Sequence, residues 1–153
     1  MTFLKTIFFS ITLSFVFLTT QSLHAQNSTI NLTVQNIQKA QGKVVIAVFK
    51  GADNFLEDGK AIASKIALVE KIGEISATFP NLPIGDDYSI AVYHDVNGNE
   101  KLNTNFFGVP TEPYGFSNNA RSKWGAPKYD IARFELNQSP KDMVIQVKKW
   151  SKQ

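Results

Sequence analysis

The chain has 153 residues and a mass of 17.0 kDa, with 43% hydrophobic and 19% charged residues and no cysteine. This globular composition excludes a disordered tail, a coiled coil and a collagen-like fibre, and the lack of cysteine excludes disulfide scaffolds and thiolate metal sites. The formal net charge of +3 is scattered, without the focused basic stripe of a nucleic-acid binder, so we expect no nucleic-acid partner.

The first 25 residues have the three-part pattern of a secretory signal peptide. Lys5 supplies a positive charge, residues 7–18 are apolar, and a polar stretch leads to Ala25. A membrane-spanning helix needs roughly 20 apolar residues, and this run is shorter. We therefore predict a signal peptide over residues 1–25 and a single mature domain over residues 26–153. The mature protein is expected in the periplasm or outside the cell, without a transmembrane anchor.

Most of the remaining chain consists of short segments with the period-two alternation of β-strands. Residues 30–35 alternate apolar and polar side chains, whereas residues 43–50 are apolar on both faces and predict a central strand. Residues 61–69 also fit a helix on propensity alone, an alternative that stays open. We expect about seven strands, at residues 30–35, 43–50, 64–71, 74–79, 88–94, 131–136 and 143–148.

Strands of this length and spacing predict an all-β fold, an antiparallel β-sandwich of immunoglobulin-like or transthyretin-like type. After Phe79-Pro80-Asn81, a Leu-Pro-x-Gly turn at residues 82–85 is predicted to reverse the chain tightly, because Pro fixes φ and Gly permits a positive φ. Tyr88 then opens the next strand.

Residues 96–130 contain no good strand and predict a long, aromatic-rich loop. Loops beyond about 12–15 residues are uncommon and often functional. Two interpretations stay open: the aromatic rings cap one end of the sandwich as a small second core, or some of them line a ligand-binding surface. We expect burial of Phe106, Phe116 and Trp124. The candidate ligand-binding residues are His94, Glu112, Tyr114, Phe116, Asn118, Asn119, Arg121 and Trp124.

The segment after the strand at 88–94 has the spacing of an EF-hand calcium loop. The candidate metal ligands are the side chains of Asp95, Asn97, Asn99 and Asn103 and the carbonyl of Lys101. Glu100 stands where such a loop needs Gly, and Phe106 where it needs Glu. With one acid among these side chains, any Ca²⁺ binding should be weak, about 10⁻⁴–10⁻³ M. The alternative is an Asn-Gly turn whose side chains bond their own backbone.

Patterns typical of enzymes are scarce in this sequence. His94 and Asp95 are adjacent on a strand, so their side chains point to opposite faces and cannot form a simple dyad. No P-loop, dinucleotide-binding or HExxH motif occurs. Glu112 and Asp130 could serve as the paired carboxylates of a glycoside hydrolase, which is kept as an alternative. A binding protein is therefore expected ahead of an enzyme.

Several motifs occur together between Tyr88 and Leu136. They are His94-Asp95, Asn97-Gly98-Asn99, Asn105-Phe106-Phe107-Gly108, Pro110-Thr111-Glu112 and Tyr114-Gly115-Phe116-Ser117-Asn118-Asn119. Together they make the chain similar to the bacterial family known as domain of unknown function 2141, over residues 30–147. The resemblance implies a small, exported, β-rich protein. It implies no catalytic residue, because that family has no established activity.

From these patterns we expect a non-catalytic binding or accessory module of the cell envelope that works through the face formed by residues 95–130. Its partner would be a cell-envelope or extracellular ligand. The alternatives are a structural cell-envelope protein without a ligand, and a hydrolase of glycans or peptides.

Overall fold

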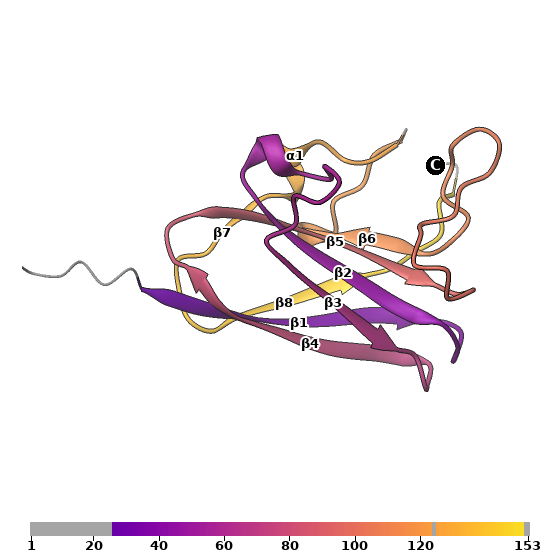
Figure 1. Ribbon diagram of the computed structural model, residues 1–153, viewed down its shortest axis with the longest axis horizontal. Helices are drawn as coiled ribbons and strands as arrows, with labels where there is room; N and C mark the ends of the chain where they lie inside the picture. Colours follow the sequence, from indigo (N-terminus) through magenta and orange to yellow (C-terminus); the bar gives the residue numbers. More distant parts are fainter. Residues whose placement is uncertain (1–25, 124, 152–153) are drawn as a thin grey trace, which may run out of the picture.

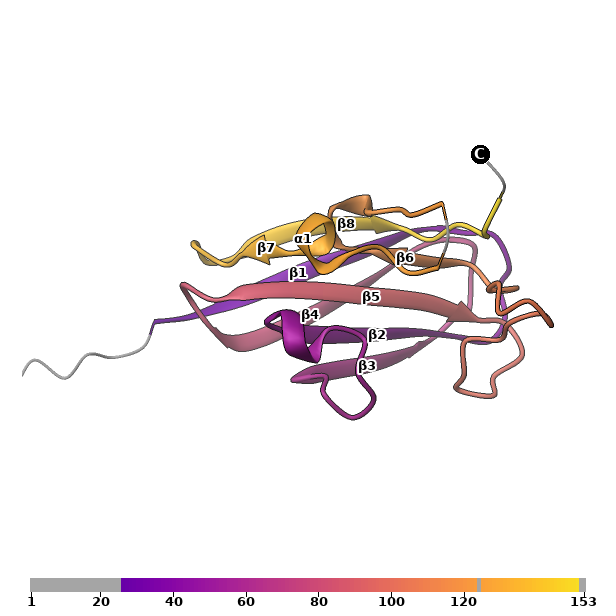
Figure 2. The ribbon, with the colours of Figure 1, turned by 90° about the horizontal axis from the view of Figure 1, so that it is seen from above.

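The computed structural model describes residues 26–123 and 125–151 and consists of two β-sheets packed face to face (Figures 1 and 2). Its strands are β1 (Asn27–Ile37), β2 (Lys43–Lys50), β3 (Ala63–Leu68), β4 (Gly73–Pro83), β5 (Asp87–Asp95), β6 (Tyr114–Phe116), β7 (Phe134–Glu135) and β8 (Lys141–Gln146). The helical pieces are α1 (Tyr129–Ala132) and two 3-10 turns, η1 (Ala52–Asn54) and η2 (Ser117–Asn119). The predicted all-β sandwich is confirmed. The predicted signal peptide and Trp124 lie outside the described residues.

The smaller sheet has the strand order β4-β1-β8, and the larger has the order β3-β2-β5-β6, with β7 also pairing with β5. All pairs are antiparallel except one, because β8 runs parallel to β1, with Ile30 opposite Lys141 and Gln35 opposite Gln146. A parallel pair needs a long crossover. Here the rest of the chain supplies it, so the first and last strands meet in one sheet.

The core lies between the two sheets and follows from strand alternation. Ile30, Leu32 and Val34 of β1 are buried, as the period-two pattern predicts. Val44, Ile46 and Val48 of β2 face them from the larger sheet. Each such side chain contributes about 1.5–3 kcal/mol on full burial. The alternate residues of β2, which are also apolar, lie on the face of the larger sheet that points away from the core, called here the outer face.

Near the start of β5, a tyrosine is held to the end of β4 by its hydroxyl group. The Tyr88 hydroxyl donates to the Pro83 carbonyl at 2.8 Å, and Gly85 has φ 90°, as the turn requires. Burial raises the pKa of Tyr88 to about 12. β4 is longer than predicted because it continues through a bulge at Pro80 and Asn81. The bulge lies on an edge strand, where a proline without an N–H is tolerated.

Other parts of the secondary structure also differ from the sequence prediction. The predicted strand at 131–136 is wrong in its first half, where α1 forms a helical turn. The alternating pattern of residues 131–136 reflects neighbouring residues only. In the fold, the Ser117 hydroxyl and the Asn118 side-chain amide donate hydrogen bonds to the backbone oxygens of Ala132 and Arg133, in place of a partner strand. The helix considered for residues 61–69 does not form, because this segment pairs with β2 as β3.

A further difference is β6, which lies inside the predicted loop. Three residues are too few to show a period-two pattern. Gly115 explains its position: a Cβ there would lie 2.7 Å from the Gln146 carbonyl oxygen, so glycine allows β6 to approach β8 closely. Tyr114 exchanges two backbone hydrogen bonds with Lys148, each 3.0 Å long. β6 therefore joins the edges of the two sheets.

Candidate functional site

The turn after β5 is organised by the buried carboxylate of Asp95. Its Oδ1 accepts the backbone N–H groups of Gly98 at 2.7 Å and Asn99 at 3.1 Å, and its Oδ2 accepts that of Glu100 at 2.6 Å. Asn97 Oδ1 accepts the Asn99 N–H at 3.1 Å in the same way. These are the self-bonded Asx side chains expected for an Asn-Gly turn.

Glu112 closes the base of the same turn from further along the chain. Its Oε1 accepts the Val96 N–H at 2.9 Å, and its Oε2 accepts the Asn103 N–H at 3.0 Å. The side chain is buried. Glu112, predicted as a ligand residue, therefore holds the two ends of the turn together.

The geometry of this turn bears on the calcium prediction without testing it. Within residues 26–123 and 125–151, no three His, Cys, Asp or Glu side chains gather as a metal cluster would. Asn103 Oδ1 accepts a hydrogen bond from Asn97 Nδ2 at 3.1 Å, and Asn99 Oδ1 accepts the Lys101 N–H at 3.0 Å. The side-chain oxygens of Asp95, Asn97, Asn99 and Asn103 thus all accept hydrogen bonds within the turn. Weak Ca²⁺ binding remains a prediction.

The hairpin after this turn presents two aromatic rings to solvent. Phe106 and Phe107 are 97% and 84% exposed and pack edge to face, with centroids 5.6 Å apart. Asn105 braces the hairpin, because its Oδ1 accepts the N–H groups of Phe107 at 2.9 Å and Val109 at 3.1 Å. The expected burial of Phe106 is therefore wrong. Among residues 26–123 and 125–151, the 104–110 hairpin pairs only with itself, through Thr104 and Pro110, and no partner strand covers its rings.

Tyr114 and Phe116, in contrast, form the second core that was one interpretation of the loop. Both are buried, and their ring centroids are 5.9 Å apart. Phe55, from the connection between β2 and β3, packs edge to face on Phe116 at 6.1 Å. This cluster, completed by Ala120 and Ala132, lies on the outer face of the larger sheet.

The other described candidate residues direct their polar groups to the backbone. His94 is buried, and its Nε2–H donates to the Gln41 carbonyl at 2.8 Å. Asn118 donates to Arg133 O at 2.8 Å, while Asn119 accepts from the Gln146 N–H at 2.8 Å. Arg121 donates to Gln146 O at 3.3 Å. These four side chains connect strands and loops and do not converge on one cavity.

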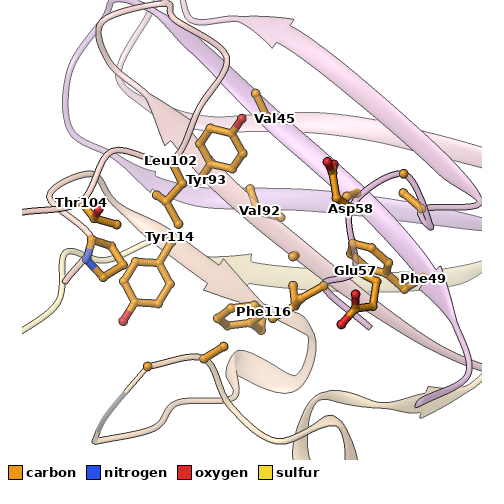
Figure 3. Close-up of a pocket in the computed structure, with 18 of the residues that line it drawn as sticks. Val45, Phe49, Glu57, Asp58, Val92, Tyr93, Leu102, Thr104, Tyr114 and Phe116 are labelled. Carbon is orange, nitrogen blue, oxygen red and sulfur yellow. The ribbon is translucent and has the colours of Figure 1, made fainter. Parts of the chain in front are cut away.

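A concave, mainly apolar surface lies over the outer face of the larger sheet, and we call it the outer-face groove (Figure 3). It encloses about 550 Å³, within the range of about 300–1,000 Å³ typical of ligand pockets. Three strands supply its floor: Val45 and Ala47 from β2, Ala91 and Tyr93 from β5, and Tyr114 and Phe116 from β6.

Two alanines create the depth of the groove. Ala47 and Ala91 stand directly opposite each other in the β2–β5 ladder, between the larger pairs Val45–Tyr93 and Phe49–Ser89. Side chains of opposite residues lie about 4.5–5.5 Å apart. A pair of methyl groups between larger neighbours therefore leaves a hollow in the middle of the sheet face.

Three loops raise the walls of the groove on the same side of the sheet (Figure 1). Leu56, Glu57 and Asp58 come from the connection between β2 and β3, whereas Leu102 and Thr104 come from the hairpin after β5. Residues 125–126 complete the third wall. Tyr93 is fixed by a hydrogen bond from its hydroxyl to Glu100 O at 2.9 Å. Burial, followed by the nearby acidic groups, raises the pKa of Tyr93, so this phenol stays neutral.

Of the predicted ligand residues, Tyr114 and Phe116 line the outer-face groove. His94 and Glu112 line a separate hollow of about 180 Å³ that also includes Lys39 and Lys149. Asp130 lies on α1 outside that hollow, so it does not share it with Glu112, as paired catalytic carboxylates would need. Sequence reasoning missed β2 and the 51–61 segment as parts of a site. The apolar pattern on both faces of β2 was the available signal.

A comparison with protein-family models found one family that matches most of this chain. The model described as an uncharacterized protein conserved in bacteria, DUF2141, matches residues 32–144. The chain belongs to this family. The match confirms the resemblance seen in the sequence and runs from β1 into β8, so it includes the groove strands and the Asp95 turn of this DUF2141 protein. Searches of curated proteins and of solved structures found no match.

No helix among the described residues is long and apolar enough to cross a membrane.

Proposed function

We propose that this DUF2141 protein is an exported, non-catalytic binding module whose outer-face groove holds an apolar ligand. The observation that carries the proposal is the groove itself: an apolar floor of three strands, hollowed at Ala47 and Ala91 and walled by loops. Ligand pockets are typically concave, mostly apolar and supplied with a few polar groups.

The role of the groove as a ligand site can be tested with a substitution that fills its hollow. Ala91→Phe should place a ring in the hollow and weaken binding of a neutral apolar fluorophore, N-phenyl-1-naphthylamine, by about tenfold or more, since most of the ligand surface would lose its contact. Ser76→Phe is the matched control. Ser76 is exposed, lies on β4 in the smaller sheet, and does not line the groove.

The control variant should bind the probe within about twofold of the wild type. Circular dichroism and a melting curve would verify that both variants are folded. If folded Ala91→Phe bound the probe as well as the wild type, the groove would not be a ligand site. The structural cell-envelope alternative would then be favoured.

Export is supported by the signal pattern in residues 1–25. Mass spectrometry of protein recovered from the exported fraction should show a chain that begins at Gln26. An intact chain beginning at Met1 in that fraction would contradict cleavage.

A further inference from the structure

The charges around the outer-face groove are unevenly distributed. Glu57 and Asp58, on the segment between β2 and β3, are exposed and line one side. The three ion pairs among the described residues use Glu100, Asp86 and Asp87, and neither groove carboxylate is in an ion pair or a side-chain hydrogen bond. Two free carboxylates therefore stand next to an apolar cavity.

The other side of the groove has no such charge. Figure 3 shows Glu57 and Asp58 across the cavity from Leu102, Thr104 and Tyr114. Among the described residues that line the groove, none is a Lys or Arg. The Arg121 guanidinium lies 5.2 Å from the centroid of the Tyr114 ring but does not line the cavity. The charge around the site thus changes from negative near Glu57 to positive near Tyr114.

We propose that the occupant of the groove is a cationic amphiphile, an apolar chain or ring system that ends in an amine or a quaternary ammonium group. The inference rests on the proposed function, because it concerns the same groove. The apolar body would lie over Ala47 and Ala91, and the cationic end would lie against Glu57 and Asp58. Arg121 disfavours the reverse orientation.

The aromatic residues of the groove suit the apolar body of this ligand. Tyr93, Tyr114 and Phe116 border the floor, where large rings supply apolar contact area. An anionic amphiphile in the same orientation would place its charge next to the like charges of Glu57 and Asp58. Lys60 follows the acidic pair in sequence but does not line the groove, so it does not neutralise the site from within.

Calorimetric titration with three chain-matched probes below their micellar concentrations tests the inference. The probes are dodecyltrimethylammonium, neutral dodecyl maltoside and anionic dodecyl sulfate. At low ionic strength the wild type should prefer the cationic probe to the neutral one by about 3- to 30-fold, the range expected for two exposed carboxylates. Added salt should reduce this preference, because the interaction is screened.

The double variant Glu57→Gln/Asp58→Asn should lose the preference and keep its affinity for the neutral probe. The matched control is Glu70→Gln/Glu135→Gln, which changes the net charge equally at exposed positions outside the groove and should retain the preference. Equal binding of cationic and neutral probes by the wild type would overturn the inference, as would a preference that survives in the double variant.

The probe results that would contradict the proposed function differ from those that would contradict only the charge inference. If the proposed function were wrong, none of the three probes would bind, or all would bind Ala91→Phe as tightly as the wild type. Failure of the charge inference alone would leave tight binding of the neutral probe that Ala91→Phe weakens.

Discussion

Residues 104–110 and residues 114–120 belong to the same predicted loop, and both contain aromatic residues, glycine and asparagine. Their rings nevertheless have opposite environments: Phe106 is 97% exposed and Phe116 is 7% exposed. Both segments are held by hydrogen bonds, the first through Asn105 and the second through Ser117, whose Oγ accepts the Ile90 N–H at 2.9 Å.

The two segments differ in the strand with which their backbones pair. Residues 114–116 pair with the edge of β5, which places Tyr114 and Phe116 on the outer face of a formed sheet. Within the described part of the chain, the 104–110 hairpin pairs only with itself, so its rings have no sheet beneath them. Apolar composition therefore does not determine burial in this loop; access to an unpaired strand edge does.

Phe116→Ala should have the largest effect on stability. The ring packs on Phe55 and Tyr114 and is buried, so its removal should lower the free energy of unfolding by about 3–5 kcal/mol. Urea unfolding followed by circular dichroism measures this. A loss below about 1 kcal/mol would mean that the second core adds little to stability.

Gly115→Ala should have an intermediate effect on the same segment. The new Cβ would meet Gln146 O at 2.7 Å and Ile145 Cγ2 at 2.8 Å, so β6 must move away from β8, at a cost of about 1–3 kcal/mol. Gly108→Ala is the comparison on the exposed hairpin: it has open space around it, and its cost would come only from φ 74°. Unchanged or increased stability in Gly115→Ala would contradict the close packing of β6 on β8.

Phe106→Ala should change the free energy of unfolding by less than about 0.5 kcal/mol, because an exposed ring buries little area in the folded state. The same urea experiment applies, with Phe116→Ala as the reference. A loss of 2 kcal/mol or more would show that the ring is buried in solution, on this chain or on a second copy. Repeating the measurement at several protein concentrations separates these two cases.

The smallest effect is expected from calcium. Asp95 already accepts three backbone N–H groups, and we expect melting curves in millimolar Ca²⁺ and in chelator to coincide. A site of the affinity predicted from the spacing would instead stabilise the protein by about 1 kcal/mol. A calcium-dependent shift that disappears in Asn99→Ala would establish the metal site and refute the turn as the whole explanation.

Local sequence patterns predicted much of the fold. The alternation in residues 30–35 gave the buried face of β1, and residues 43–50 gave β2 with the correct bounds. The Asn-Gly turn with its self-bonding side chains was also among the alternatives. These features depend on neighbouring residues, whose preferences are visible within a few positions. The prediction failed for residues 131–132 and for β6, where contacts with distant strands determine the conformation.

The sequence by itself determined the all-β character and the family and offered the turn at Asp95 as one of two alternatives, because alternation, turn residues and motifs are local properties of the chain. Only the tertiary structure decided where Phe106 and Phe116 lie, that Glu112 closes the Asp95 turn, and that the two alanines stand opposite each other. The outer-face groove depends on the register of β2 against β5 and on loops far apart in sequence. Such a site exists only once the sheet has formed, since no single segment carries its shape.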